Sequence, residues 1–224
     1  YLARVTLERY PTELSQYLDS AMANKQPAEN LAWAQAALSL EGRAKSLLAR
    51  WPSIKDAALS DDEFKAVCGL LRSPQVMAAA TLIFHAANAD YLVEMALNHH
   101  LEVGSPQLAE LLKPVCQRLL TTGDPAKMHV AARATDLLEV GELEAQLAEL
   151  LPTRLDDPIF VEAAAIALAR KSDAFVDEFK LILTQAKVPA TARLSAFSAL
   201  ARVDANAALQ LAKPTVEALG SGIQ

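Results

Sequence analysis

The chain contains nearly the same helix twice, and this repetition limits its fold more than any other feature. The segment DPIFVEAAAIALAR at 157 to 170 is followed by VPATARLSAFSALAR at 188 to 202, and both copies close with Ala-Leu-Ala-Arg. Arg170 and Arg202 therefore stand in equivalent places, 32 residues apart. A fixed interval of this length is typical of arrays in which each unit is a pair of helices.

Four predicted helix starts support the same interval, because each combines a capping side chain with a proline. A Ser or Asp oxygen accepts hydrogen bonds from the free amides of the first helical turn, and a proline there gives up an N–H that has no helical partner. Corresponding prolines stand 31 to 33 residues apart. The starts are Ser73-Pro74, Ser105-Pro106, Asp124-Pro125 and Asp157-Pro158, and Val188-Pro189 is a fifth without a capping side chain.

The apolar residues between these starts have helical spacing. Val161, Ala164, Ala165 and Leu168 stand at i, i+3, i+4 and i+7, which places them on one helix face. The chain has seven glycines and lacks the Asn-Gly, Asp-Gly and Gly-Gly pairs that close two-residue hairpins. One helix pair has too little interior to fold alone, so neighbouring pairs must cover its apolar faces. The sequence therefore predicts an all-α stack of antiparallel helix pairs.

The stack is expected to occupy most of the chain. We predict about five repeats over 61 to 219, a less regular N-terminal helical cap over 1 to 60, and a frayed tail or linker over 220 to 224. Trp33 and Trp51 are expected to be core anchors of the cap. The predicted repeats are 61 to 87, 90 to 121, 124 to 151, 157 to 186 and 189 to 219.

Two of these units carry a recognisable motif. Asp157-Pro158 is followed by VEAAAIALARKSD, and Pro189 is followed after two residues by ARLSAFSALARVD. These segments resemble HEAT repeats, whose pattern has Asp-Pro, Val-Arg, an alanine pair, Ala-Leu-Gly and a closing Asp. Ala169 and Ala201 depart from it, because glycine is usual there. The resemblance is best over 124 to 219 and implies a right-handed α-α superhelix that presents an extended surface to another protein.

Composition argues against several function classes. The formal net charge of -6 and the aromatic content of 5% do not suit nucleic-acid binding, which needs clustered Lys and Arg or a base-stacking platform. No apolar stretch reaches the roughly 18 to 20 residues of a membrane span. We expect a cytoplasmic protein, although the chain begins at Tyr1 and an exported origin stays open.

Few residues suggest catalysis or metal binding. Cys68 and Cys116 stand among apolar neighbours and are expected to be buried thiols, with a disulfide left open. His99 and His100 are adjacent, so on a helix their side chains point about 100° apart and are poorly placed to share a metal. No nucleophile elbow, phosphate loop or dinucleotide motif occurs. We predict no enzyme activity, no cofactor and no metal.

Acidic and basic residues are unevenly distributed in the acidic stretch from 136 to 157. It contains seven acids and one base, Arg154, and so carries the whole formal net charge. Such a cluster favours a basic partner surface, mainly through the association rate; the alternative is a solvated face with acids near helix N-termini. The candidate partner-binding residues are Glu142, Glu144, Glu149, Asp156 and Asp157, with Asp177 and Lys180 on the following helix.

The sequence therefore predicts a protein-protein interaction scaffold or adaptor. The alternative is a lyase or isomerase with a groove between repeats, since the family that the motif resembles includes bilin lyases. That enzyme would need a concave pocket with a cluster of polar side chains.

Overall fold

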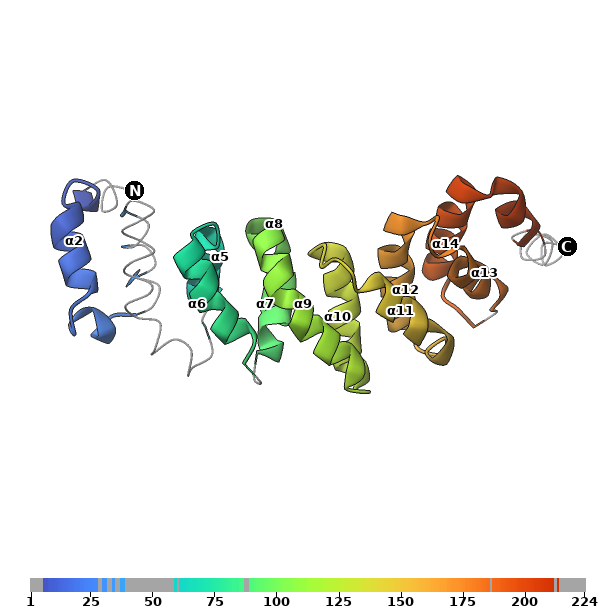
Figure 1. Ribbon diagram of the computed structural model, residues 1–224, viewed down its shortest axis with the longest axis horizontal. Coiled ribbons are helices and arrows are strands. Elements are labelled where there is room, and N and C mark those ends of the chain that lie inside the picture. The colour runs from blue at the N-terminus through green and yellow to red at the C-terminus, as the bar shows by residue number, and fades with distance from the viewer. Residues whose placement is uncertain are drawn as a thin grey trace, which may run out of the picture. The chain divides into compact units, whose positions relative to one another are not determined.

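The computed structural model describes residues 6–27, 30, 31, 34, 37, 38, 59, 61–86, 89–185, 187–211 and 213. These residues are all-helical, and the helices pack mostly against their sequence neighbours (Figure 1). The prediction of an all-α protein is thus confirmed. The chain forms two compact units, Tyr1–Val115 and Cys116–Gln224, which are described separately below.

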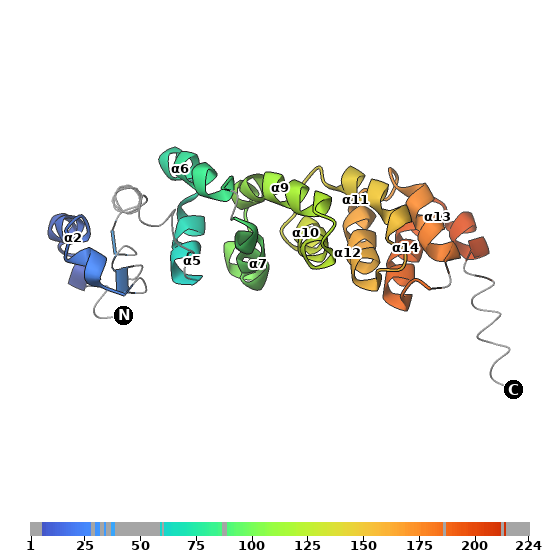
Figure 2. The same ribbon diagram turned by 90° about the horizontal axis from the view of Figure 1, so that it is seen from below.

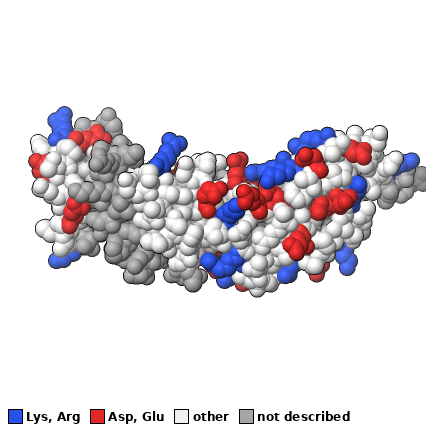
Figure 3. Space-filling model, in the orientation of Figure 1, with Lys and Arg blue, Asp and Glu red and all other residues white. Residues whose placement is uncertain are grey.

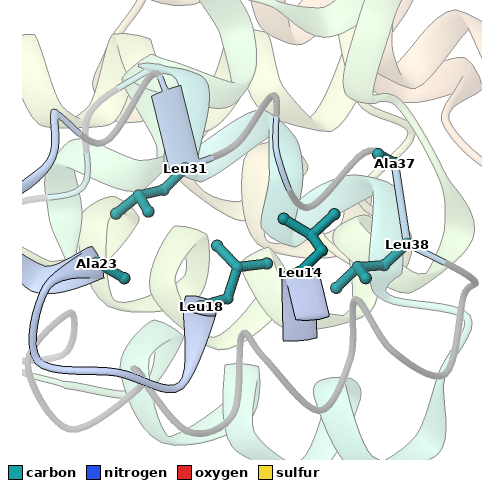
Figure 4. Close-up of a cluster of buried hydrophobic side chains, with 6 residues drawn as sticks. All are labelled: Leu14, Leu18, Ala23, Leu31, Ala37 and Leu38. Atoms are coloured by element: carbon teal, nitrogen blue, oxygen red, sulfur yellow. The ribbon is translucent and has the colours of Figure 1, made fainter. Parts of the chain in front are cut away.

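The N-terminal unit begins with a small apolar cluster. Helix α2 (Pro11–Leu18) is followed by the 3-10 helix η1 (Ala23–Lys25). The leucines of α2 point toward those of the segment that follows (Figure 4). Trp33 and Trp51, the predicted anchors of this cap, lie outside the described residues. The buried cluster comprises Leu14, Leu18, Ala23, Leu31, Ala37 and Leu38.

Further helices complete the N-terminal unit and lead into the C-terminal one. Phe64 and Phe84 are fully buried and pack as a tilted aromatic pair, with ring centroids 6.4 Å apart. The repeat predicted over 90 to 121 was expected to be one pair of helices, but its first helix is interrupted at His99 (φ -115°, ψ 19°), where a short new helix starts. The helices are α5 (Asp61–Leu70), α6 (Pro74–Phe84), α7 (Asp90–Asn98), α8 (His100–Val103) and α9 (Pro106–Thr121).

In the C-terminal unit, α12 packs against both α10 and α14, and the three lie side by side in both ribbon views (Figure 2). Fully buried alanines such as Ala131, Ala164 and Ala196 line these helices, and their small side chains let helix axes approach closely. The elements are α10 (Pro125–Leu137), α11 (Glu144–Leu150), η2 (Leu151–Thr153), α12 (Pro158–Leu168), η3 (Ala169–Lys171), α13 (Val176–Thr184) and α14 (Ala190–Val203), followed by helical residues 205–211.

The predicted helix starts at Pro74, Pro106, Pro125 and Pro158 are confirmed. Oxygens of the three preceding residues Ser105, Asp124 and Asp157 accept backbone hydrogen bonds of 3.2, 3.0 and 3.1 Å. Ser73 differs from the expectation, because its hydroxyl donates to Gln75 Oε1 (2.9 Å) and makes no cap bond to the backbone. The start after Val188 lacks a side-chain cap, as expected, and its helix begins at Ala190.

Candidate functional site

The acidic stretch runs from the end of α10 to the start of α12, and three of its acids are paired with two bases of η3. Arg170 Nη2 lies 3.1 Å from Asp136 Oδ1, and Arg170 Nη1 lies 3.7 Å from Glu139 Oε1. Lys171 Nζ lies 3.0 Å from Glu144 Oε1. Acidic and basic side chains accordingly alternate over the C-terminal unit on the face drawn in Figure 3. The stretch is therefore not an unbroken acidic patch.

Two of the predicted partner-binding acids are engaged within the protein. Glu144 is buried at the first position of α11, where the helix dipole favours a carboxylate. Asp157 caps α12, and its carboxylate receives a hydrogen bond from His129 Nε2 (2.7 Å to Oδ2). Both positions fit the alternative reading of acids at helix N-termini.

The environment of Asp157 has opposing effects on its pKa. Desolvation by burial raises the pKa, but the hydrogen bonds from His129 and from the amide of Phe160 favour the ionised carboxylate and outweigh it. The net effect lowers the pKa below its ordinary value of 3.8. Asp157 is thus held as a carboxylate that joins α10 to α12.

The other predicted site residues lie on the surface. Glu142 (φ +63°), Glu149 and Asp156 are exposed. Asp177 and Lys180 form a single i, i+3 pair at 3.4 Å along α13, with 93% and 44% of their side chains accessible. Of the seven predicted residues, Glu144 and Asp157 thus have partners within the protein, and the other five lie at the surface.

The repeated arginines have a role that the sequence pattern did not reveal. Arg170 Nη2 donates to the backbone carbonyl of Asp136 at the end of α10, and Arg202 Nη2 donates to the carbonyl of Ala169 (2.9 Å) at the end of α12. Each arginine thus binds the C-terminal end of an earlier helix, α10 or α12, where carbonyls lack helical partners and attract cations. The recurrence of Arg in the Ala-Leu-Ala-Arg motif is the sequence feature that could have indicated this role.

A groove between α10 and α12 is the feature that sequence analysis missed. Its cavity of about 380 Å³ is lined by residues from one face of each helix. Three of its apolar side chains, Leu137, Ile159 and Ile166, are 39%, 54% and 38% exposed. The 7-residue spacing of the two isoleucines on a helix whose opposite face is already apolar could have indicated it. The lining residues are Arg133, Asp136, Leu137, Ile159, Glu162, Ala163 and Ile166.

Two charged side chains line this groove in addition to Asp136. Arg133 is exposed and Glu162 is half-buried. Within the described part of the chain, neither forms an ion pair, whereas Asp136 is engaged by Arg170. The groove therefore combines apolar walls with one cation and one anion that are available to a ligand.

A second cluster of polar groups lies in the N-terminal unit, between α5 and α8. Lys65 Nζ contacts Glu102 Oε2 at 2.9 Å, and His99 Nε2 contacts Asp61 Oδ2 at 3.1 Å. The hydrogen bond from Lys65 is the largest influence on Glu102 and lowers its pKa. A cavity of about 300 Å³ adjoins Lys65, Glu102 and Cys68. The acids and bases of this cluster are satisfied by one another.

The two cysteines are unsuited to nucleophilic chemistry. Cys68 and Cys116 are free and buried, which confirms their expected burial and excludes the disulfide. Desolvation by burial raises the pKa of each thiol to about 12, so almost no thiolate forms near neutral pH. Among the described residues, no three His, Cys, Asp or Glu side chains are grouped so that they could hold a metal ion.

Comparison with known proteins leaves the chain without a family assignment. No protein family matches it, and no curated protein or solved structure shows significant similarity to it. None of the described helices combines the length and apolar character that a bilayer crossing requires. The geometry of the groove is therefore the main guide to function.

Proposed function

We propose that the chain is a non-enzymatic interaction module, built as a right-handed HEAT-like stack, that binds another protein through the groove between α10 and α12. The contacts of α12 with both α10 and α14 support the stack, since first helices of successive units pack in order there. The observation that carries the function is the exposure of Leu137, Ile159 and Ile166 around one cavity. Contiguous exposed apolar side chains rimmed by polar ones are typical of protein-binding surfaces.

The walls of the groove are held at both ends. At the helix starts, the Asp157 carboxylate joins His129; at the helix ends, Arg170 binds the Asp136 carbonyl. Binding to walls that are already in place costs less conformational entropy than binding that must order them. These two links therefore favour a groove that keeps its shape before the partner arrives.

The exposed acids contribute to the association rate. Glu142, Glu149 and Asp156 are exposed and would steer a basic partner surface toward this unit, with an effect that weakens as salt is added. Changing these three to Lys should slow association with little change in helical circular dichroism. Glu144 is left out because its carboxylate is buried and paired with Lys171, so its reversal would test folding instead.

A photo-crosslinking experiment tests the groove. A benzophenone amino acid at Ile166 should yield one discrete adduct in extract of the source cells, to be identified by mass spectrometry. The matched control carries the same probe at Leu82, which is 71% exposed in the N-terminal unit. The adduct at position 166 should fade when Ile159→Lys is added. Equal labelling at both positions, or an adduct indifferent to Ile159→Lys, would contradict the proposal.

A lyase or isomerase that uses the same groove is the second candidate. The volume of about 380 Å³ lies within the roughly 300 to 1,000 Å³ of small-molecule sites, and Arg133 and Glu162 offer a cation and an anion, respectively, to a polar substrate. A small ligand would raise the melting temperature of the wild type but not that of Ile166→Trp, which fills the cavity.

A further inference from the structure

The backbone around the groove limits how a partner can bind. Both walls are helices, α10 and α12, whose backbone groups are used within each helix. The described residues include no strand, so this surface lacks the row of free N–H and C=O groups that β-strand addition requires. A partner segment must therefore satisfy its own backbone hydrogen bonds before it enters apolar surroundings.

The side chains of the groove exclude two further recognition modes. Polyproline segments dock on aromatic-lined grooves, and none of the seven lining residues is aromatic. Phosphorylated or acidic motifs are bound by clusters of arginine, whereas this groove has Arg133 together with the acids Asp136 and Glu162. An α-helix laid along the groove remains, because its backbone is already paired and its side chains can fill the cavity.

The spacing of the lining residues suits an incoming helix. On α12, Ile159, Glu162, Ala163 and Ile166 stand at i, i+3, i+4 and i+7, and so form one continuous stripe. Ala163 is only 7% exposed and forms the floor between the two isoleucines. A helix with apolar residues at i, i+3 or i+4, and i+7 would match the exposed isoleucines and Leu137 of α10.

The charges of the groove specify the rest of the partner. Glu162 is half-buried between Ile159 and Ile166 and has no ion-pair partner in the described part of the chain. A helix that covered it with apolar side chains would bury an unpaired carboxylate, which is costly. Arg133 lies on the facing wall and needs an anion for the same reason, because apolar side chains over it would bury an unpaired cation. Complementarity therefore demands a cation against Glu162 and an anion against Arg133.

Resting on the proposed function, we infer that the element bound in this groove is an amphipathic α-helix with a basic residue opposite Glu162 and an acidic residue opposite Arg133. Its apolar stripe fills the cavity, and the two ion pairs determine its direction and register. A helix with the opposite charge order is rejected, because like charges would meet at both positions.

Selection from a peptide display library tests this inference. The probes are peptides with leucines fixed at i, i+4 and i+7 and all other positions randomised, selected on the whole immobilised chain. Three targets are compared: the wild type, Glu162→Arg, and Glu94→Arg. The last makes the same charge change at an exposed position of α7, outside the groove and outside the acids proposed to steer the partner.

Peptides selected on the wild type should share one basic and one acidic position and should become helical when bound. The preference at the basic position should switch to Asp or Glu on Glu162→Arg and stay unchanged on Glu94→Arg. A selected peptide should lose roughly five- to tenfold in affinity on Glu162→Arg. Selected peptides that bind in extended form, or whose charges ignore Glu162→Arg, would overturn the inference.

The result is separable from the test of the proposed function. An adduct at Ile166 that persists while the peptide charges prove indifferent would leave the groove as a binding site and remove only the helix and its charge order. Failure of the crosslink together with failure of all peptide selection would remove both. Circular dichroism and thermal melting of each variant exclude misfolding as the cause.

Discussion

Replacement of Arg170 tests whether the repeated arginine stabilises the packing of neighbouring helices, as its contacts indicate. Arg170→Ala removes the guanidinium that donates to the carbonyl and carboxylate of Asp136 and lies near Glu139. Arg202→Ala is the matched change 32 residues later, where the donation to the Ala169 carbonyl is the single bond described for that side chain. The two variants remove the same atoms from equivalent positions but break different numbers of contacts.

The expected magnitudes follow from exposure. A hydrogen bond to a charged group contributes about 1.5–3 kcal/mol when shielded, but the Arg170 side chain is 38% exposed, so solvent lowers this contribution. The Asp136 pair adds about 0.5 kcal/mol, and Glu139, at 80% exposure, adds almost nothing. We expect a loss of about 1–2 kcal/mol for Arg170→Ala and about 0.5–1 kcal/mol for Arg202→Ala.

Urea unfolding followed by circular dichroism measures both losses. Arg170→Lys is the third variant, since it keeps the charge but lacks the planar fork that reaches two acceptors; it should recover about half of the Arg170→Ala loss. The reasoning would be refuted if Arg202→Ala lowered the unfolding free energy as much as Arg170→Ala does. It would also be refuted if Arg170→Lys were as stable as the wild type. If the dependence of the unfolding free energy on urea concentration is the same in all three variants as in the wild type, the losses do not come from changes in the denatured state.

Three further predictions concern the interior. Phe160→Ala, at a fully buried position of α12, should cost about 3–5 kcal/mol in urea unfolding, and a loss below about 1 kcal/mol would contradict the described core. The folded pKa of Asp157 lies below 3.8, so the Asp157 carboxylate stabilises the folded protein fully above that value and loses this effect as the pH falls through the folded pKa. The difference in unfolding free energy between wild type and Asp157→Asn should therefore shrink as acid is added. A difference that stays constant with pH would contradict this prediction. Because desolvation by burial raises the pKa of Cys68 and Cys116 to about 12, both thiols should react with Ellman's reagent only on unfolding, and rapid reaction of the native protein would disprove their burial.

The positions of helix starts could be predicted because they are encoded locally. A proline after Asp124 or Asp157 sets a backbone angle and supplies a cap within a few residues, and no distant contact is needed. The prediction failed at Ser73, whose hydroxyl binds Gln75 instead of the backbone, and at His99, where one expected helix divides in two. At such positions a side chain can form different hydrogen bonds of similar energy, and the local sequence does not show which of them forms.

The candidate site could be predicted only in part. The excess of acids near 136 to 157 was evident, but charge counting does not show that Arg170 and Lys171 of η3 pair with Asp136 and Glu144. The groove was missed because its two walls are more than 20 positions apart in the chain. Exposed isoleucines on an alanine-rich helix look the same in sequence whether or not a neighbouring helix forms the second wall.

The sequence by itself determined that this protein is helical, where many of its helices begin, and which apolar residues share a helix face. These properties depend on backbone angles, capping and apolar periodicity, which act within one or two turns. Only the tertiary structure decided which side chains meet between helices: the arginines on the preceding carbonyls, His129 on Asp157, and the groove of Ile159 and Ile166. The physical reason is that such meetings depend on the distance and rotation between packed helices, which all of their contacts set together.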